Sequence, residues 1–250
     1  MRIASIGSHV SAFTKAAARA ALTLLYPPHC AMCEADTSVG IHLCPKCARD
    51  VDPVLEPRCE RCSQPFSGAI TGTFTCSNCD DRKLHFDCAV APYLSRKVVR
   101  EFIHRFKYNK HYYLRHQLAE WMEHGLHDDR ITRQQIDGFV PVPLHPTRQR
   151  EREFNQADVL AGLLSKRTGT PLQRSLERTR YTTTQTALDR DARMENLRGA
   201  FRVRHTADVT GRHLVLIDDV FTTGSTVDEC SRVLREAGAA SVRVLTVARG

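Results

Sequence analysis

One stretch decides the fold of this chain, and it reads Leu214-Val215-Leu216-Ile217-Asp218-Asp219-Val220-Phe221-Thr222-Thr223-Gly224-Ser225-Thr226. Its first four residues are apolar, which predicts a strand buried on both faces. Two carboxylates follow, where we expect the strand to emerge from the sheet. Hydroxyl residues then surround Gly224, and the apolar periodicity of the next segment predicts a helix.

The turn between this strand and this helix has the chemistry of a phosphate site. A Gly-containing turn at a helix N-terminus directs backbone N–H groups and the positive end of the helix dipole at one spot. Asp218 and Asp219 are acceptors beside that spot and suit the vicinal hydroxyls of a sugar, so together they describe a ribose 5-phosphate. The alternative is an ordinary strand–turn–helix in which Asp and Thr only cap the helix. The turn also supplies hydroxyl donors, from Thr222, Thr223, Ser225 and Thr226.

The stretch resembles the motif with which type I phosphoribosyltransferases bind phosphoribosyl pyrophosphate (PRPP). The resemblance implies an α/β fold with a mostly parallel sheet and helices on both faces, and a ligand at the C-terminal strand ends. It assigns the 5-phosphate to residues 222–226, with Gly224 at their centre, and the ribose hydroxyls to Asp218 and Asp219. It also implies Mg²⁺ between pyrophosphate and ribose oxygens.

Residues 30–79 hold four Cys-x-x-Cys pairs, which predict a double zinc ribbon. The two thiolates of one pair can reach a common tetrahedral ion, and two pairs complete a site. We expect pairs adjacent in sequence to share an ion, with an interleaved arrangement as the alternative. Disulfides are disfavoured because we find no secretory signal. A closed shell of four thiolates gives zinc a structural role. The predicted ligands of the two Zn²⁺ ions are Cys30, Cys33, Cys44 and Cys47, and then Cys59, Cys62, Cys76 and Cys79.

The formal charge of +8 is carried by the C-terminal part, since residues 30–88 have a net charge of −3. Residues 96–116 are the most basic segment, with a net charge of +6 and interleaved aromatic residues. Such a segment can track single-stranded nucleic acid, by charge and by stacking. The alternatives are an amphipathic helix with a solvated basic face, and steering of an anionic substrate. The candidate nucleic-acid contacts are Arg100, Arg105, Lys107 and Lys110.

The N-terminal residues predict an amphipathic helix that ends at Pro27-Pro28. Lys15 and Arg19 interrupt its apolar region, and no apolar run approaches the ~20 residues that span a bilayer. We therefore expect a cytoplasmic protein without a membrane span. The expected domains are an N-terminal helix over 1–25, a double zinc ribbon over 26–88 and a phosphoribosyltransferase-like domain over 89–250.

Residues 139–157 carry a second resemblance. An apolar strand runs into a Pro-locked turn, and spaced arginines and then Phe154-Asn155-Gln156 follow. This order resembles the ComF family, which includes competence proteins of natural transformation and a gluconate-gene-linked branch. Glu153 stands where that family usually has Gly, which puts the local geometry in doubt if the Gly serves an unusual backbone angle. By resemblance the turn is a pyrophosphate loop, with backbone N–H donors from Leu144 and His145.

Residues 174–204 are basic, and residues 178–185 are polar and poorly periodic, which predicts a mobile loop. By resemblance this is the flexible catalytic loop of type I enzymes. Arg178 and Arg180 would neutralise a departing pyrophosphate. The alternative is an ordinary solvated basic loop.

Two functional hypotheses follow. The ComF resemblance implies a PRPP-binding protein that handles single-stranded DNA during transformation, beside a competence DNA helicase. Phosphoribosyl transfer would release pyrophosphate, but no residue set forms a recognisable pocket for an acceptor. The alternative is a non-catalytic nucleic-acid-binding or gluconate-linked accessory protein with a vestigial or regulatory PRPP site, because a fold does not determine a function.

Overall fold

The computed structural model describes residues 27–68, 70, 72–108, 111–181 and 196–250, so the predicted helix over 1–25 lies outside the described residues. The chain forms two compact units, residues 1–50 and residues 51–250. The boundary falls between the second and third Cys-x-x-Cys pairs.

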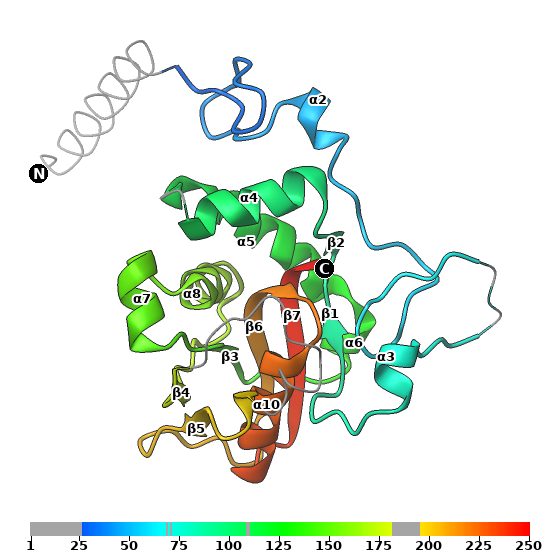
Figure 1. The fold of residues 1–250 in the computed structure, drawn as a ribbon, viewed down its shortest axis with the longest axis vertical. Helices are drawn as coiled ribbons and strands as arrows, with labels where there is room; N and C mark the ends of the chain where they lie inside the picture. Colours follow the sequence, from blue (N-terminus) through cyan, green and yellow to red (C-terminus); the bar gives the residue numbers. More distant parts are fainter. Residues whose placement is uncertain (1–26, 69, 71, 109–110, 182–195) are drawn as a thin grey trace, which may run out of the picture. The chain divides into compact units, whose positions relative to one another are not determined.

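The helices and strands are, in chain order, α2 (Pro45–Ala48), α3 (Ser77–Asp80), β1 (Ala89–Val90), β2 (Tyr93–Leu94), α4 (Lys97–Tyr108), η1 (Tyr112–Leu114), α5 (Arg115–His124), η2 (Gly125–His127), α6 (Asp129–Thr132), β3 (Gly138–Pro141), α7 (Pro146–Arg152), α8 (Gln156–Thr168), β4 (Leu176–Arg178), β5 (Phe201–Val203), β6 (His213–Phe221), α10 (Ser225–Glu236) and β7 (Ser241–Arg249) (Figure 1).

The larger unit is built on a parallel sheet with the strand order β1-β7-β6-β3, and β2 also pairs with β7. The four apolar residues of the opening stretch are fully buried in β6, which confirms the predicted strand. The strand does not end at the carboxylates, however. It continues to Phe221, because β7 pairs with it along its whole length, up to Phe221 opposite Arg249. Asp218 and Asp219 are therefore held by the sheet, not by a loop.

Helices cover both faces of this sheet, as the buried residues on both sides of β6 and β7 require. On one face α5 and α8 pack against each other and against the central strands. The helix α10 joins β6 to its parallel neighbour β7 and covers the other face (Figure 1). This placement is the one expected from the usual right-handed crossover between parallel strands. The basic segment 96–116 contains an amphipathic helix, α4, whose apolar face is formed by the buried residues Val98, Val99, Phe102, Ile103 and Phe106. No helix among the described residues is long and apolar enough to cross a membrane.

The segment after β3 contains a helix that the sequence analysis did not predict. His145 caps α7, its ring nitrogen accepting from Thr147 N at 3.2 Å, and Pro146 takes the first helical turn, where its missing N–H costs nothing. Glu153 ends α7 with a left-handed φ of 67°. The unusual backbone angle is thus kept although a side chain stands in place of Gly. Asn155 then caps α8 and donates to Val142 O at 3.0 Å, which ties the helix to the end of β3.

This angle leads to a stability prediction. A left-handed backbone costs a non-Gly residue about 1–2 kcal/mol, so Glu153→Gly should raise the free energy of unfolding by about 1 kcal/mol. Thermal denaturation should show an increase in Tm of about 2–4 °C. Glu151→Gly, in the body of α7, is the matched control and should lower the Tm, because Gly destabilises a right-handed helix. An unchanged or lower Tm for Glu153→Gly would contradict the prediction.

Candidate functional site

The turn after β6, residues 222–226, is called the phosphate loop below. It leads from Phe221 to the first residue of α10, Ser225, through Gly224 at a left-handed φ of 78°. A Cβ at Gly224 would lie 2.6 Å from Cζ of Phe221, so only Gly fits this position. The close approach of the backbone to the Phe221 ring makes the turn tight and places α10 directly behind it.

Arginine side chains hold the carbonyl groups of this turn. Arg249 Nη1 donates to Phe221 O at 3.0 Å and to Thr222 O at 2.9 Å, and Arg82 Nη1 donates to Thr223 O at 3.2 Å. The N–H and C=O of a trans peptide point in opposite directions. The N–H groups of residues 222–224 are therefore directed away from the arginines. Together with the N-terminus of α10, they form an arrangement suited to an anion.

Asp218 and Asp219, called the acidic pair below, lie just before this loop in β6. Asp219 is 7% exposed, and its Oδ2 lies 2.7 Å from Lys107 Nζ of α4. The half-buried Asp218 accepts a hydrogen bond from Asp219 N at 2.8 Å. Burial and the neighbouring Asp219 charge raise the pKa of Asp218 to about 7, although Lys107 and Arg152 oppose the shift. The sequence analysis assigned Lys107 to a nucleic-acid surface, whereas the structure places its ammonium group at the acidic pair.

Arg152, which the sequence analysis did not select, lies near Asp218 and contacts a second such residue, Gln156. Arg152 of α7 donates to Gln156 Oε1 at 3.1 Å and to Tyr108 OH at 2.9 Å, with its guanidinium over the Tyr108 ring. Gln156 is only 2% exposed, and its amide nitrogen has no hydrogen-bond partner among the described residues. The spaced arginines and the Phe-Asn-Gln sequence were the available signal for both residues.

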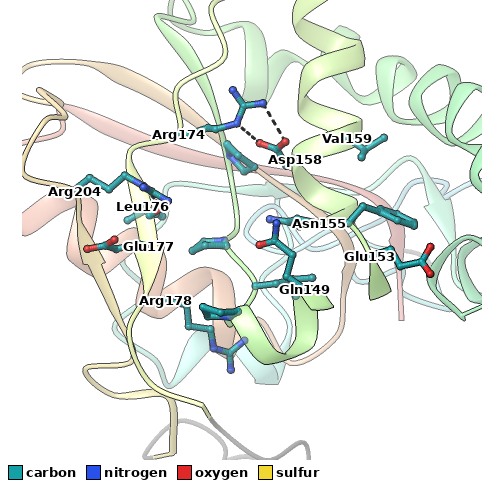
Figure 2. Close-up of a pocket in the computed structure, with 15 residues that line it drawn as sticks. Gln149, Glu153, Asn155, Asp158, Val159, Arg174, Leu176, Glu177, Arg178 and Arg204 are labelled. Carbon is teal, nitrogen blue, oxygen red and sulfur yellow. Dashed lines mark hydrogen bonds and ion pairs between the residues drawn. The ribbon is translucent and has the colours of Figure 1, made fainter. Parts of the chain in front are cut away.

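The segment after β3 lines a cavity of about 440 Å³ with β4 and α8 (Figure 2). Leu144, Gln149, Asn155 and Arg178 all line it, so the structure brings the predicted pyrophosphate loop to Arg178. The guanidinium of Arg178 lies over the Phe201 ring, 5.2 Å from its centre, and burial lowers the Arg178 pKa. None of the described lining residues comes from 218–226.

The other residues of the predicted catalytic loop are only partly described. Arg180 donates to Asn196 O at 2.8 Å and to Arg198 O at 3.0 Å. These hydrogen bonds connect the residues that follow β4 to the residues that precede β5. Tyr181 packs edge-on against the His145 ring, with 5.1 Å between ring centres. Residues 182–195 lie outside the described part of the chain.

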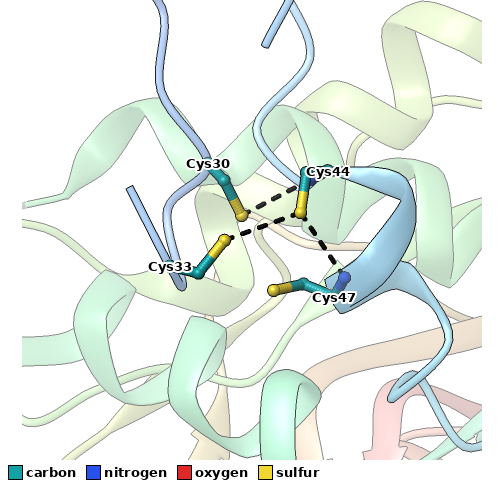
Figure 3. Close-up of side chains that lie close together, drawn as sticks. All are labelled: Cys30, Cys33, Cys44 and Cys47. Atoms are coloured by element: carbon teal, nitrogen blue, oxygen red, sulfur yellow. Dashed lines mark hydrogen bonds between the residues drawn. The ribbon is translucent and has the colours of Figure 1, made fainter. Parts of the chain in front are cut away.

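The eight cysteines of the Cys-x-x-Cys pairs form two groups of four. Within each group the sulfur atoms lie within 4.8 Å of one another. The first cysteine cluster is Cys30, Cys33, Cys44 and Cys47 (Figure 3), and the second cysteine cluster is Cys59, Cys62, Cys76 and Cys79. Pairs adjacent in sequence therefore share a site, as predicted.

The geometry of both clusters fits zinc. Cys33 Sγ lies 3.6 Å from Cys44 Sγ, and Cys62 Sγ lies 3.5 Å from Cys76 Sγ. Thiolates at about 2.3 Å from a tetrahedral ion are about 3.8 Å apart, whereas a disulfide requires about 2.05 Å. Backbone N–H groups of Cys44 and Cys76 point at Cys30 Sγ and Cys59 Sγ, at 3.4 and 3.3 Å. Burial raises the pKa of the Cys30 thiol, but the backbone hydrogen bonds outweigh it and lower the value to about 6.

Comparisons with known proteins find relatives for both the cysteine-rich part and the C-terminal part of the chain. The family described as "Double zinc ribbon domain" matches residues 21–81, and the family described as "Phosphoribosyl transferase domain" matches residues 156–250. "Competence protein F" of Haemophilus influenzae is 30% identical over 83% of this chain and 90% of its own length. "DNA utilization protein YhgH" of Escherichia coli K12 is 34% identical over 88% of this chain and 89% of its own. "Competence protein ComFC" of Streptococcus pneumoniae is 25% identical over 83% and 87%.

The two clusters predict the metal content of the protein. Atomic absorption of the purified chain should find two zinc ions per molecule, one for each cysteine cluster. Cys33→Ser and Cys79→Ser should each reduce the content to one, because a four-thiolate site that lacks a ligand holds its ion weakly. A wild-type content of one zinc ion or none would contradict the assignment.

Proposed function

Since this chain belongs to the family of competence protein F and the DNA utilization protein YhgH, we propose that it binds PRPP at the end of β6 and serves the handling of incoming single-stranded DNA. The observation that carries the PRPP proposal is the phosphate loop beside the acidic pair. Its peptide N–H groups face away from Arg249 and Arg82 and offer a phosphate several donors. The carboxylates of the acidic pair would accept hydrogen bonds from the ribose hydroxyls.

The charges around this site fit a metal-bound, polyanionic ligand. Carboxylate oxygens of the acidic pair are ligands of the kind that Mg²⁺ prefers, directly or through water. When bound, Mg²⁺ would neutralise part of the negative charge of the pyrophosphate. Lys107 and Arg152 stand beside the acidic pair and would add positive charge on the side of α4 and α7.

Phosphoribosyl transfer is the reaction that such a site would support. The bond between the anomeric carbon and the pyrophosphate oxygen breaks, pyrophosphate leaves with the electron pair, and an acceptor atom bonds to the anomeric carbon. Arg178 is the cation proposed to offset the charge on the leaving group, because it lines the same cavity as Leu144. The acceptor is not assigned. A regulatory PRPP site in a non-catalytic or gluconate-linked accessory protein is the alternative.

A second proposed activity, binding of single-stranded DNA, rests on the surface around η1. Tyr108, Tyr112 and Tyr113 are 54%, 41% and 42% exposed, so part of each residue is accessible to bases. Arg115 lies over the Tyr112 ring, 4.1 Å from its centre, and adds a cation beside a stacking platform. Arg100 is exposed on α4, Arg105 is paired with Glu101, and Lys110 lies outside the described residues. Association with a competence DNA helicase remains part of this proposal.

The PRPP proposal predicts a pH-dependent affinity. Because the Asp218 pKa is raised to about 7, its carboxylate becomes fully charged only above that pH, and PRPP with Mg²⁺ should bind more tightly at pH 8 than at pH 6. Asp218→Asn should bind about tenfold more weakly at pH 8, because it loses hydrogen bonds to a charged group.

Isothermal titration calorimetry of both proteins at several pH values tests this prediction. The Asp218→Asn variant should retain only the pH dependence that comes from the ligand phosphates, which titrate at about pH 6. Wild-type affinity in Asp218→Asn would refute the proposed site. Release of pyrophosphate with a panel of bases and amines would identify an acceptor.

The DNA proposal predicts different effects for a stacking residue and a charged residue. Tyr112→Ala should weaken binding of a single-stranded oligonucleotide about fivefold or more without changing the salt dependence. Arg115→Ala should reduce the slope of log K against log salt by about 0.7, the value for one phosphate contact. Fluorescence anisotropy at several salt concentrations measures both. Arg202→Ala, which removes an exposed arginine of β5 paired with Glu177, is the control and should change neither. Unchanged binding by both test variants would remove this surface from the interface.

A further inference from the structure

The segment that follows the second cysteine cluster lies against the phosphate loop. Arg82 comes shortly after Cys79, and its guanidinium holds Thr223 O at 3.2 Å. The backbone N–H of His85 donates to Asp228 Oδ1 at 2.7 Å, and its ring Nδ1 lies 3.3 Å from Asp228 Oδ2. Asp228 belongs to the first turn of α10. The segment therefore contacts both the loop and the helix that begins at the loop.

An apolar contact reinforces these polar ones. The buried ring of Phe86 packs edge-to-face with the ring of Phe221, with 5.8 Å between ring centres. The Phe221 ring is also the group that lies directly under Gly224, so its position determines how tightly the phosphate loop can fold. Both rings belong to one buried apolar cluster with the four thiols of the second cysteine cluster.

The segment that contains Cys59 and Cys62, the first two cysteines of the second cysteine cluster, is held by hydrogen bonds to β1 and α6. Ser63 Oγ donates to Ala89 O of β1 at 2.8 Å. Arg130 of α6 donates to Glu60 O at 2.9 Å and is itself paired with Asp128 at 2.7 Å. A metal ion bound by all four cysteines would join this segment to the segment that contains Cys76 and Cys79. It would thereby hold the start of residues 82–86 in place. The first cysteine cluster, by contrast, belongs to the other compact unit.

From these contacts we infer that the second zinc site positions the phosphate loop, through Arg82, His85 and Phe86, and so controls the affinity for PRPP. This inference rests on the proposed function for its ligand. Arg82 and His85 act as positioning residues, since they hold a carbonyl and a helix terminus on the side of the loop opposite to the anion. Zinc at the second cysteine cluster is then required for tight PRPP binding, whereas zinc at the first cysteine cluster is not.

The first test uses the full zinc-loaded chain and measures PRPP affinity by calorimetry. Arg82→Ala should bind about tenfold more weakly, because it removes a hydrogen bond from a charged donor to the loop. Its zinc content and Tm should match the wild type, and deuterium exchange should be faster over residues 222–228. Lys83→Ala is the matched control, since it removes an exposed positive charge from the next position. Arg82→Lys should recover part of the affinity.

Wild-type affinity and exchange in Arg82→Ala, or an equal loss in Lys83→Ala, would overturn the inference. The second test compares Cys79→Ser with Cys33→Ser, which should each lose one zinc ion, while only Cys79→Ser loses PRPP affinity. If Cys79→Ser does not fold, the PRPP affinity and the deuterium exchange of Arg82→Ala decide whether the inference holds. If the wild-type chain does not bind PRPP, the proposed function fails. Deuterium exchange over residues 222–228 in Cys79→Ser and Arg82→Ala still decides whether the second zinc site orders the loop: wild-type exchange in both variants would overturn that part of the inference.

Discussion

The pairing of β6 with β7 along their full length is the constraint on which the candidate site depends. Because Phe221 is still paired with Arg249, the end of β6 cannot fray, and the chain must turn at one defined place. Arg249 then reaches back from the end of β7 to hold the carbonyl groups of Phe221 and Thr222. The Phe221 ring occupies the space beneath Gly224. Sheet pairing, arginine donors and an aromatic ring thus fix the phosphate loop.

The electrostatics of the site follow from the same strand. A β-strand directs successive side chains to opposite faces, so Asp218 and Asp219 meet different surroundings although they are adjacent. Asp219 faces Lys107 of α4 and is paired. Asp218 is held in a poorly solvated position beside another negative charge, and its pKa rises to about 7. Asp218 is therefore a carboxylate that changes its charge within the neutral range.

The two cysteine clusters resemble each other in spacing and geometry, but they stand in different structural contexts. The second cysteine cluster shares its buried apolar surroundings with the end of β6 and the start of α10. The first cysteine cluster belongs to a small unit in which the only helix among the described residues is the single turn α2. A small unit buries little apolar surface, so a metal must supply much of its stability. Equivalent ligand sets thus need not have equivalent roles.

Local patterns were readable from the sequence alone. The apolar run 214–217 predicted a buried strand, the residues around Gly224 predicted a turn into a helix, and the Cys-x-x-Cys spacing predicted two zinc sites with the correct partners. These features depend on residues close together in the chain, and there spacing determines geometry. The apolar face of α4 was predictable for the same reason.

The positions of the ends of long side chains depend on tertiary contacts and could not be predicted from local patterns. Lys107 lies in a basic helix, and no pattern in its neighbourhood indicates that it turns to Asp219 and not to solvent. Arg82 and Thr223 are far apart in sequence, and they meet because the second cysteine cluster packs against the sheet. Glu153 keeps a backbone angle that its own residue type disfavours, because the surrounding contacts outweigh the local cost. The order of residues along the chain was enough to predict the strand, the turn and the metal ligands, while packing determined which charges surround them.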